Sequence, residues 1–201
     1  MTRPRRLALA AAVAVLGLTL TACDPAKAGA AAVVGSNRIS ERTVSDTAQA
    51  VYKVQGTEQI PQAELNREIV RRMVTAQLVE ELAKREDITV TQGEVDDLIQ
   101  QAIQGSTRQA LTDQLAQQAG VAPAEVNAYA RNFLLRQKLD EKFGNGNADQ
   151  GHAAVTAKLG ALSKEVGTEV SPRYGTWDAG SASVKPPTDD LSKPASPSPT
   201  G

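Results

Sequence analysis

The chain has 201 residues, with 22 Lys and Arg against 23 Asp and Glu, so its formal net charge is −1. It contains one cysteine, Cys23, and one histidine, His152. This balance of charges excludes a broad basic face for nucleic-acid binding. The single thiol excludes a disulfide within the chain, so a packed core alone must hold the fold together.

The first 22 residues have the parts of a secretory signal. Three arginines within the first six residues favour the anionic cytoplasmic face of a membrane, and Leu7 to Leu20 forms an apolar stretch behind them. This stretch of 14 residues is shorter than the roughly 20 that a transmembrane helix needs. Small residues lead into Cys23, as in the bacterial lipoprotein signals that this segment resembles. We therefore expect a lipoprotein signal peptide over residues 1–22 and attachment of diacylglycerol to the Cys23 thiol.

A lipid on Cys23 predicts a protein anchored at the outer, extracytoplasmic face of the cell membrane. Two acyl chains give stable anchoring, because each buried CH₂ contributes about 0.8 kcal/mol. The alternative is an ordinary secretory signal in which Cys23 falls at the end by chance. The adjacent Arg5 and Arg6 also leave a twin-arginine export route open beside the general one.

The mature chain, residues 23–201, is expected to hold one domain between two flexible ends. Residues 23–30 are interpreted as a tether, and residues 31–178 as the folded domain. Residues 179–201 carry five prolines among Ser, Thr and Gly with few large apolar side chains, so we expect a disordered Pro/Ser-rich tail.

The N-terminal half of the domain combines a short hairpin with helices. Ala31 to Val34 reads as a strand that turns at Gly35 and returns at Ile39, and Ser40 then caps a first helix. A second helix follows Pro61. Its apolar residues recur every three or four positions and are too numerous for a thin stripe, which predicts a central helix. They are Leu65, Ile69, Met73, Val74, Leu78 and Leu82.

Further helices are predicted from their start and stop signals. Thr91 and Glu94 form a capping box ahead of a helix that ends near Gly105. A Gln-rich helix runs to Gly120, and Pro123 begins another that Gly144 closes. The last elements are a helix with apolar residues spaced along 155–166 and an extended segment over Val170 to Trp177, which contains Pro172.

The sequence offers no recognisable catalytic constellation. It has no P-loop, no G-x-S-x-G and no Cys/His metal spacing. The glycine- and asparagine-rich stretch over Gly144 to Gly151 follows a helix, unlike a Rossmann loop, and lacks the Gly and Glu that a calcium loop requires. We interpret it as a linker, and His152 beside it as a solvated surface residue. No cofactor or metal is expected.

A family resemblance rests on a series of short motifs in a fixed order. The hairpin of residues 32–40 is followed by a long helix, by Ile-Thr-Val-Thr over residues 88–91 and by Glu-Val-Asp over residues 94–96. This order resembles the N-terminal chaperone domain of SurA, PrsA and related foldases. The resemblance continues to Asp178. It implies a mostly α, helical domain with a small β pairing between Ala31 to Val34 and Val170 to Thr176.

The resemblance also implies a function, and this chain differs from related foldases in one respect. Related foldases commonly insert a parvulin prolyl-isomerase domain where this chain has only Gly144 to Gly151. We therefore expect no prolyl isomerisation by the parvulin route. The expected function is ATP-independent holding of unfolded exported polypeptides near the membrane. Two alternatives are a lipoprotein dedicated to one partner and a residual isomerase that depends on His152.

Clients would contact an apolar groove among the helices. Methionine and aromatic side chains adapt to varied apolar partners. The candidate client-binding residues are therefore Met73, Tyr129, Phe133 and Phe143. The competing interpretation of each is plain packing in the core.

Overall fold

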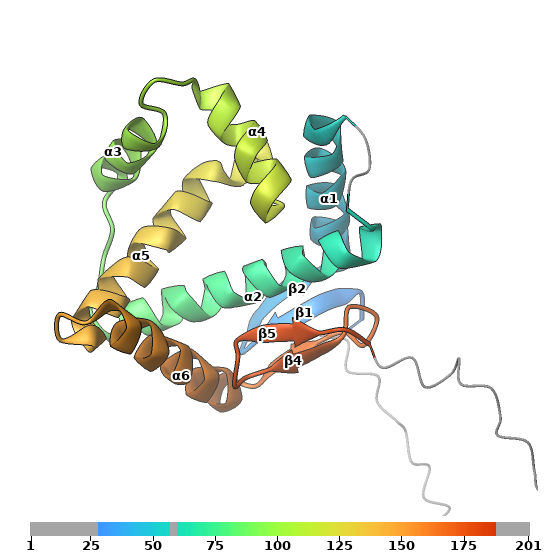
Figure 1. Cartoon of the computed structure of the whole chain (residues 1–201). Helices are drawn as coiled ribbons and strands as arrows, with labels where there is room; N and C mark the ends of the chain where they lie inside the picture. Colours follow the sequence, from blue (N-terminus) through green and yellow to red (C-terminus); the bar gives the residue numbers. More distant parts are fainter. Residues whose placement is uncertain (1–27, 57–59, 188–201) are drawn as a thin grey trace, which may run out of the picture.

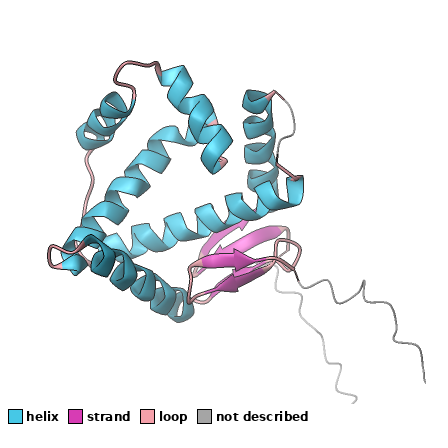
Figure 2. Cartoon of the chain, in the orientation of Figure 1, coloured by secondary structure: helices cyan, strands magenta, loops and turns pink. Residues whose placement is uncertain are grey.

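The computed structural model describes residues 28–56 and 60–187, and these form a mostly helical domain with two small sheets (Figure 1, Figure 2). The predicted signal peptide, Cys23 and most of the predicted tether lie outside the described residues. The helices are α1 (Glu41–Gln55), α2 (Gln62–Arg85), α3 (Gln92–Ala102), α4 (Arg108–Ala119), α5 (Val126–Gly144) and α6 (Ala148–Val166), with a short 3₁₀ turn over Pro123–Glu125. The strands are β1 (Ala30–Val34), β2 (Asn37–Ser40), β3 (Thr168–Val170), β4 (Thr176–Asp178) and β5 (Ser183–Lys185).

The predicted helix ends are confirmed by their local chemistry. The Ser40 hydroxyl accepts a hydrogen bond of 3.0 Å from the Thr43 amide at the start of α1. The Thr91 and Glu94 side chains make a complete capping box at the start of α3. Gly120 ends α4 in the left-handed conformation that favours glycine.

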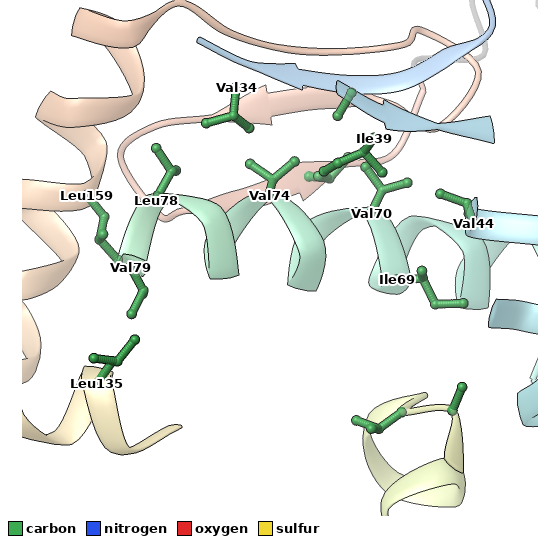
Figure 3. Packing of buried hydrophobic residues seen from close by; sticks show 14 of the residues in the cluster. Val34, Ile39, Val44, Ile69, Val70, Val74, Leu78, Val79, Leu135 and Leu159 are labelled. Atoms are coloured by element: carbon green, nitrogen blue, oxygen red, sulfur yellow. The ribbon is translucent and has the colours of Figure 1, made fainter. Parts of the chain in front are cut away.

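The central helix is α2, as its dense apolar pattern predicts. It packs against the sheet on one side and against α5 and α6 on another (Figure 1). Val70, Val74 and Leu78 lie toward Val34 and Ile39 of the sheet, while Val79 lies near Leu135 of α5 (Figure 3). Its eight buried residues are Leu65, Ile69, Val70, Val74, Leu78, Val79, Leu82 and Ala83.

The two ends of the domain are joined by a three-stranded antiparallel sheet in the order β2-β1-β3. The β1–β2 hairpin turns at Gly35 and Ser36, and Gly35 takes a positive φ of 59° while Ser36 does not. This pattern matches a type II′ turn. The pairing of the N-terminal strand with the C-terminal segment is confirmed, with Ala32 opposite Val170.

The C-terminal segment that pairs with β1 lies earlier in the chain than the predicted Val170 to Thr176. The strand β3 covers Thr168–Val170, and the chain then turns at Pro172, where proline provides no amide for a ladder. Thr176 belongs instead to a second antiparallel pair, β4–β5. The strand β5 lies within the segment expected to be a disordered tail, so that expectation is corrected for Ser183–Lys185, where Val184 is buried against the core.

The interpretation of Gly144 to Gly151 as a linker is wrong for its second half. Only three residues, Asn145 to Asn147, separate α5 from α6, and the Asn147 side chain accepts from the Gln150 amide to cap α6. Gly151 is buried in α6 against α5, where an added Cβ would lie 2.1 Å from the Asp140 carbonyl oxygen. Gly151 allows α6 to pack closely against α5. The Gly- and Asn-rich sequence before it instead suggested that the helix was interrupted there.

Substitution of Gly151 tests this helix contact. Gly151→Ala should lower the free energy of unfolding by about 1–3 kcal/mol, because the new methyl group overlaps the backbone of α5. The measurement is urea unfolding followed by circular dichroism. Gly93→Ala, in the first turn of α3, is the control: its Cβ would come no closer than 3.9 Å to the Thr91 hydroxyl, so stability should stay constant or rise. Equal stability of Gly151→Ala and the wild type would contradict the contact.

The start of α3 predicts a dependence of stability on pH. Hydrogen bonding to Lys138 of α5, with help from Thr91, lowers the pKa of Glu94 from 4.5 to about 2. A carboxylate with a lowered pKa stabilises the fold above its unfolded pKa, and this contribution is lost as the pH falls from about 4.5 to about 2.

Glu94→Gln keeps a side chain suited to a capping box and removes only the charge. The variant should be less stable than the wild type at pH 7, and the difference should vanish near pH 2. Unfolding curves across this pH range measure it. In a Lys138→Gln background, which lacks the main partner of Glu94, the same substitution should change the stability less at pH 7. A difference for Glu94→Gln that is constant with pH would refute the assignment.

Candidate functional site

A groove of about 470 Å³ lies between α2 and α5 and reaches β2 at one end. On α2, Met73, Ala76 and Glu80 recur at intervals of three and four residues and line one wall. On α5, Tyr129 and Phe133 line the other wall at the same spacing. The groove therefore lies on a face of α2 different from the face that packs against the sheet.

The structure brings together three of the four predicted client-binding residues. Met73 and Tyr129 are half-buried in the groove. Phe133 is 52% exposed and is the only large apolar residue of the described part of the chain that is classed as exposed. An exposed aromatic side chain in a groove is more informative than a buried one, because burial is the usual state of such residues.

Phe143 does not belong to this groove. Its ring is half-buried at the C-terminal end of α5, and the Lys158 ammonium of α6 lies 4.2 Å from the ring centroid. This distance is typical of a cation–π contact. Phe143 therefore contributes to the contact between α5 and α6.

Ion pairs and hydrogen bonds fix the walls of the groove. The Arg72 guanidinium lies 2.8 Å from the Glu125 carboxylate and donates to the Gly120 carbonyl, which ties α2 to the start of α5. Arg71 donates to Glu68, and this bond raises the pKa of Arg71, so the guanidinium stays charged. Both arginines are thus held at one wall.

One direct hydrogen bond connects the helices across the groove. The Asn132 side-chain amide of α5 donates to the Ala76 carbonyl of α2 at 3.1 Å. Because the bond joins the two helices between their apolar side chains, it fixes their spacing. The groove is therefore preformed.

Three polar atoms of groove-lining residues on α2 are buried without a hydrogen-bond partner: Arg72 Nε, Thr75 Oγ1 and Gln77 Oε1. These atoms have almost no accessible surface, so they lie beneath the wall of the groove and a bound molecule does not reach them. Sequence reasoning missed Thr75 and Gln77, because polar residues on a helix look the same in sequence whether they face solvent or a groove.

A second cavity, of about 610 Å³, adjoins the first at the corner between α5 and α6. The two share Phe133 and Arg136 as lining residues. His152 lines the second cavity with its side chain 72% exposed, and its Nδ1 atom lies 3.9 Å from the Asp140 carboxylate. Arg136 pairs with the same carboxylate at 3.1 Å. The solvent exposure expected for His152 is confirmed, and its carboxylate neighbour is one that the sequence spacing did not indicate.

Within residues 28–56 and 60–187, no helix combines the length and apolar character needed to cross a membrane. The same part of the chain has no group of three or more His, Cys, Asp and Glu side chains suited to hold a metal ion.

Comparison with known proteins identifies the family. No curated protein and no solved structure matches the chain. A family model described as the SurA-like N-terminal domain matches residues 7–140, which extend from the apolar leader through most of α5 and make up two thirds of the chain. The mostly helical fold agrees with this match. The chain therefore belongs to the family of SurA-like N-terminal domains, whose role is chaperone-like and involves polypeptide substrates.

Proposed function

We propose that this protein is an ATP-independent holdase, which binds unfolded exported polypeptides in the groove between α2 and α5. The observation that carries the proposal is the exposed Phe133 beside Met73 and Tyr129 in a preformed groove. Membership of a chaperone-like family supports it. Apolar segments of an unfolded chain gain free energy when they leave water, at roughly 25 cal/mol per Å² of apolar surface.

The proposal includes no catalytic step. Where related foldases carry a parvulin domain, this chain joins α5 to α6 through three residues. We assign His152 no role in isomerisation, because the groups around it are Arg136 and Asp140 and it is largely exposed. Binding and release of clients is the whole of the proposed activity.

The proposal places the holdase at the outer face of the cell membrane, anchored by lipid on Cys23. The basic and apolar leader and the small residues before Cys23 support this location. An anchored holdase would meet exported chains as they leave the membrane and before they aggregate.

Lipid attachment is tested by labelling. Cells given an alkyne fatty acid should incorporate it into the wild-type protein and not into Cys23→Ala, because no other cysteine is available. The signal is read after click coupling to a fluorophore and gel electrophoresis. Ser36→Ala, in the β1–β2 turn, serves as a control that should label normally. Equal labelling of Cys23→Ala and the wild type would exclude a lipid on this residue.

The holdase activity is tested with an aggregating unfolded client. The soluble form, residues 24–201, should suppress light scattering near a stoichiometric ratio and without ATP. Phe133→Ala should weaken suppression severalfold while leaving the stability nearly unchanged, because the ring is half exposed.

Phe143→Ala removes the same side chain from the same helix outside the groove, and it is the matched control. It should retain suppression as long as it stays folded at the assay temperature, which circular dichroism checks. Equal loss of suppression in the two folded variants would contradict the groove. No effect of the wild-type protein on several clients would instead favour a lipoprotein dedicated to one partner.

A further inference from the structure

The two cavities adjoin each other along α5, and we call them together the track. The first extends from Ile39 past Met73, and the second ends at Asp149 near the start of α6. Phe133 and Arg136 line both and mark where they meet. A bound molecule longer than the apolar groove would therefore continue into the second cavity.

Charge is unevenly distributed along this track. In the first cavity the arginines of α2 are paired, Arg71 with Glu68 and Arg72 with Glu125. Arg38 of β2 lies at the other end of this cavity, and it donates to the Ala28 carbonyl and has no ion pair among the described residues. In the second cavity Arg136 is paired with Asp140.

Three carboxylates on the track have no ion pair among the described residues. They are Glu80 on α2, Glu141 on α5 and Asp149 on α6. Glu141 accepts a single hydrogen bond from the Gln137 amide, at 3.2 Å. The second cavity thus has an excess of negative charge, because Arg136 is its only cationic lining residue and is already paired. Its electrostatic complement is a cation.

The mixed lining of the track indicates the kind of molecule that fits it. Met73, Tyr129 and Phe133 offer apolar surface in the first cavity, whereas Glu141 and Asp149 offer negative charge in the second. An extended polypeptide can carry apolar side chains and a Lys or Arg in one segment, whereas an acyl chain carries no cation. The lining therefore favours a polypeptide over a lipid.

We infer that the track binds an extended polypeptide segment in which a block of apolar residues carries a flank of lysine or arginine on one side. The apolar block contacts Met73, Tyr129 and Phe133, and the basic flank reaches Glu141 and Asp149. This inference rests on the proposed function and adds a selectivity to it: the protein binds apolar segments with basic flanks more tightly than those with acidic ones.

The test uses three fluorescein-labelled peptides with one shared apolar centre and flanks of Lys, Gln or Glu. Fluorescence anisotropy measures their dissociation constants for the full chain. At low salt the Lys peptide should bind about three- to tenfold more tightly than the Glu peptide, which is the scale of two or three exposed charge pairs. The ratio should fall toward one as added salt screens the charges.

The double variant Glu141→Gln with Asp149→Asn should bring the Lys and Glu peptides to similar affinities and leave the Gln peptide unchanged. The matched control, Glu64→Gln with Asp97→Asn, changes the net charge equally at positions that do not line the track. It should preserve the wild-type ratio.

The selectivity is overturned if the wild type binds the Lys and Glu peptides equally at low salt, or if both double variants reduce the ratio equally. In either case the holdase proposal would stand if the wild type binds the Gln peptide and Phe133→Ala weakens that binding. If no peptide binds and no client aggregation is suppressed, both proposals fail. The chain could instead bind no peptide and self-associate in a way that Phe133→Ala abolishes. This result would assign the track to a second copy of the chain and overturn the inference.

Discussion

The burial of α2 between the sheet and the α5–α6 pair is the contact on which the rest of the structure depends. Full burial of a Val, Leu or Ile side chain contributes about 1.5–3 kcal/mol, and α2 has seven such residues among its eight buried ones. The same helix contacts β1, β2 and β5, so it connects strands from both ends of the chain. These contacts fix the position of α2, and the face of α2 that carries Met73, Ala76 and Glu80 forms a wall of the groove.

The groove follows from how α5 meets α2. Leu135 of α5 is buried in the core, whereas Phe133, two residues earlier, remains half exposed. Gly151 allows α6 to approach α5 closely at Asp140, which fixes the far end of α5 and opens the second cavity beside it. A binding track thus results from ordinary core packing together with one aromatic residue left uncovered.

Much of the fold could be predicted because local chemistry decides it. Ser40, the Thr91–Glu94 capping box and Gly120 satisfy backbone groups at helix ends, and such signals depend only on nearby residues. The errors at Gly151 and at β5 have the opposite cause. A glycine in a helix contact and a short strand in a Pro-rich region depend on tertiary packing, because Gly151 lies against the Asp140 backbone of α5 and β5 packs against α2.

The candidate site was predictable in part for the same reason. Met73, Tyr129 and Phe133 could be selected by residue type, because methionine and aromatic residues suit adaptable apolar surfaces. The same criterion also selected Phe143, because periodicity does not say which part of α5 meets α6. The three unpaired carboxylates carry no sequence signal, since their importance arises only where α2, α5 and α6 come together.

The most direct test of the groove is site-specific photo-crosslinking to an unfolded client. Ala128 lines the groove, whereas Ala157 is equally classed as exposed and lines none of the cavities described here. A photoreactive residue placed at each position should crosslink strongly to client from position 128 and weakly from position 157. Similar crosslinking from both positions, or stronger crosslinking from position 157, would contradict client binding in the groove between α2 and α5.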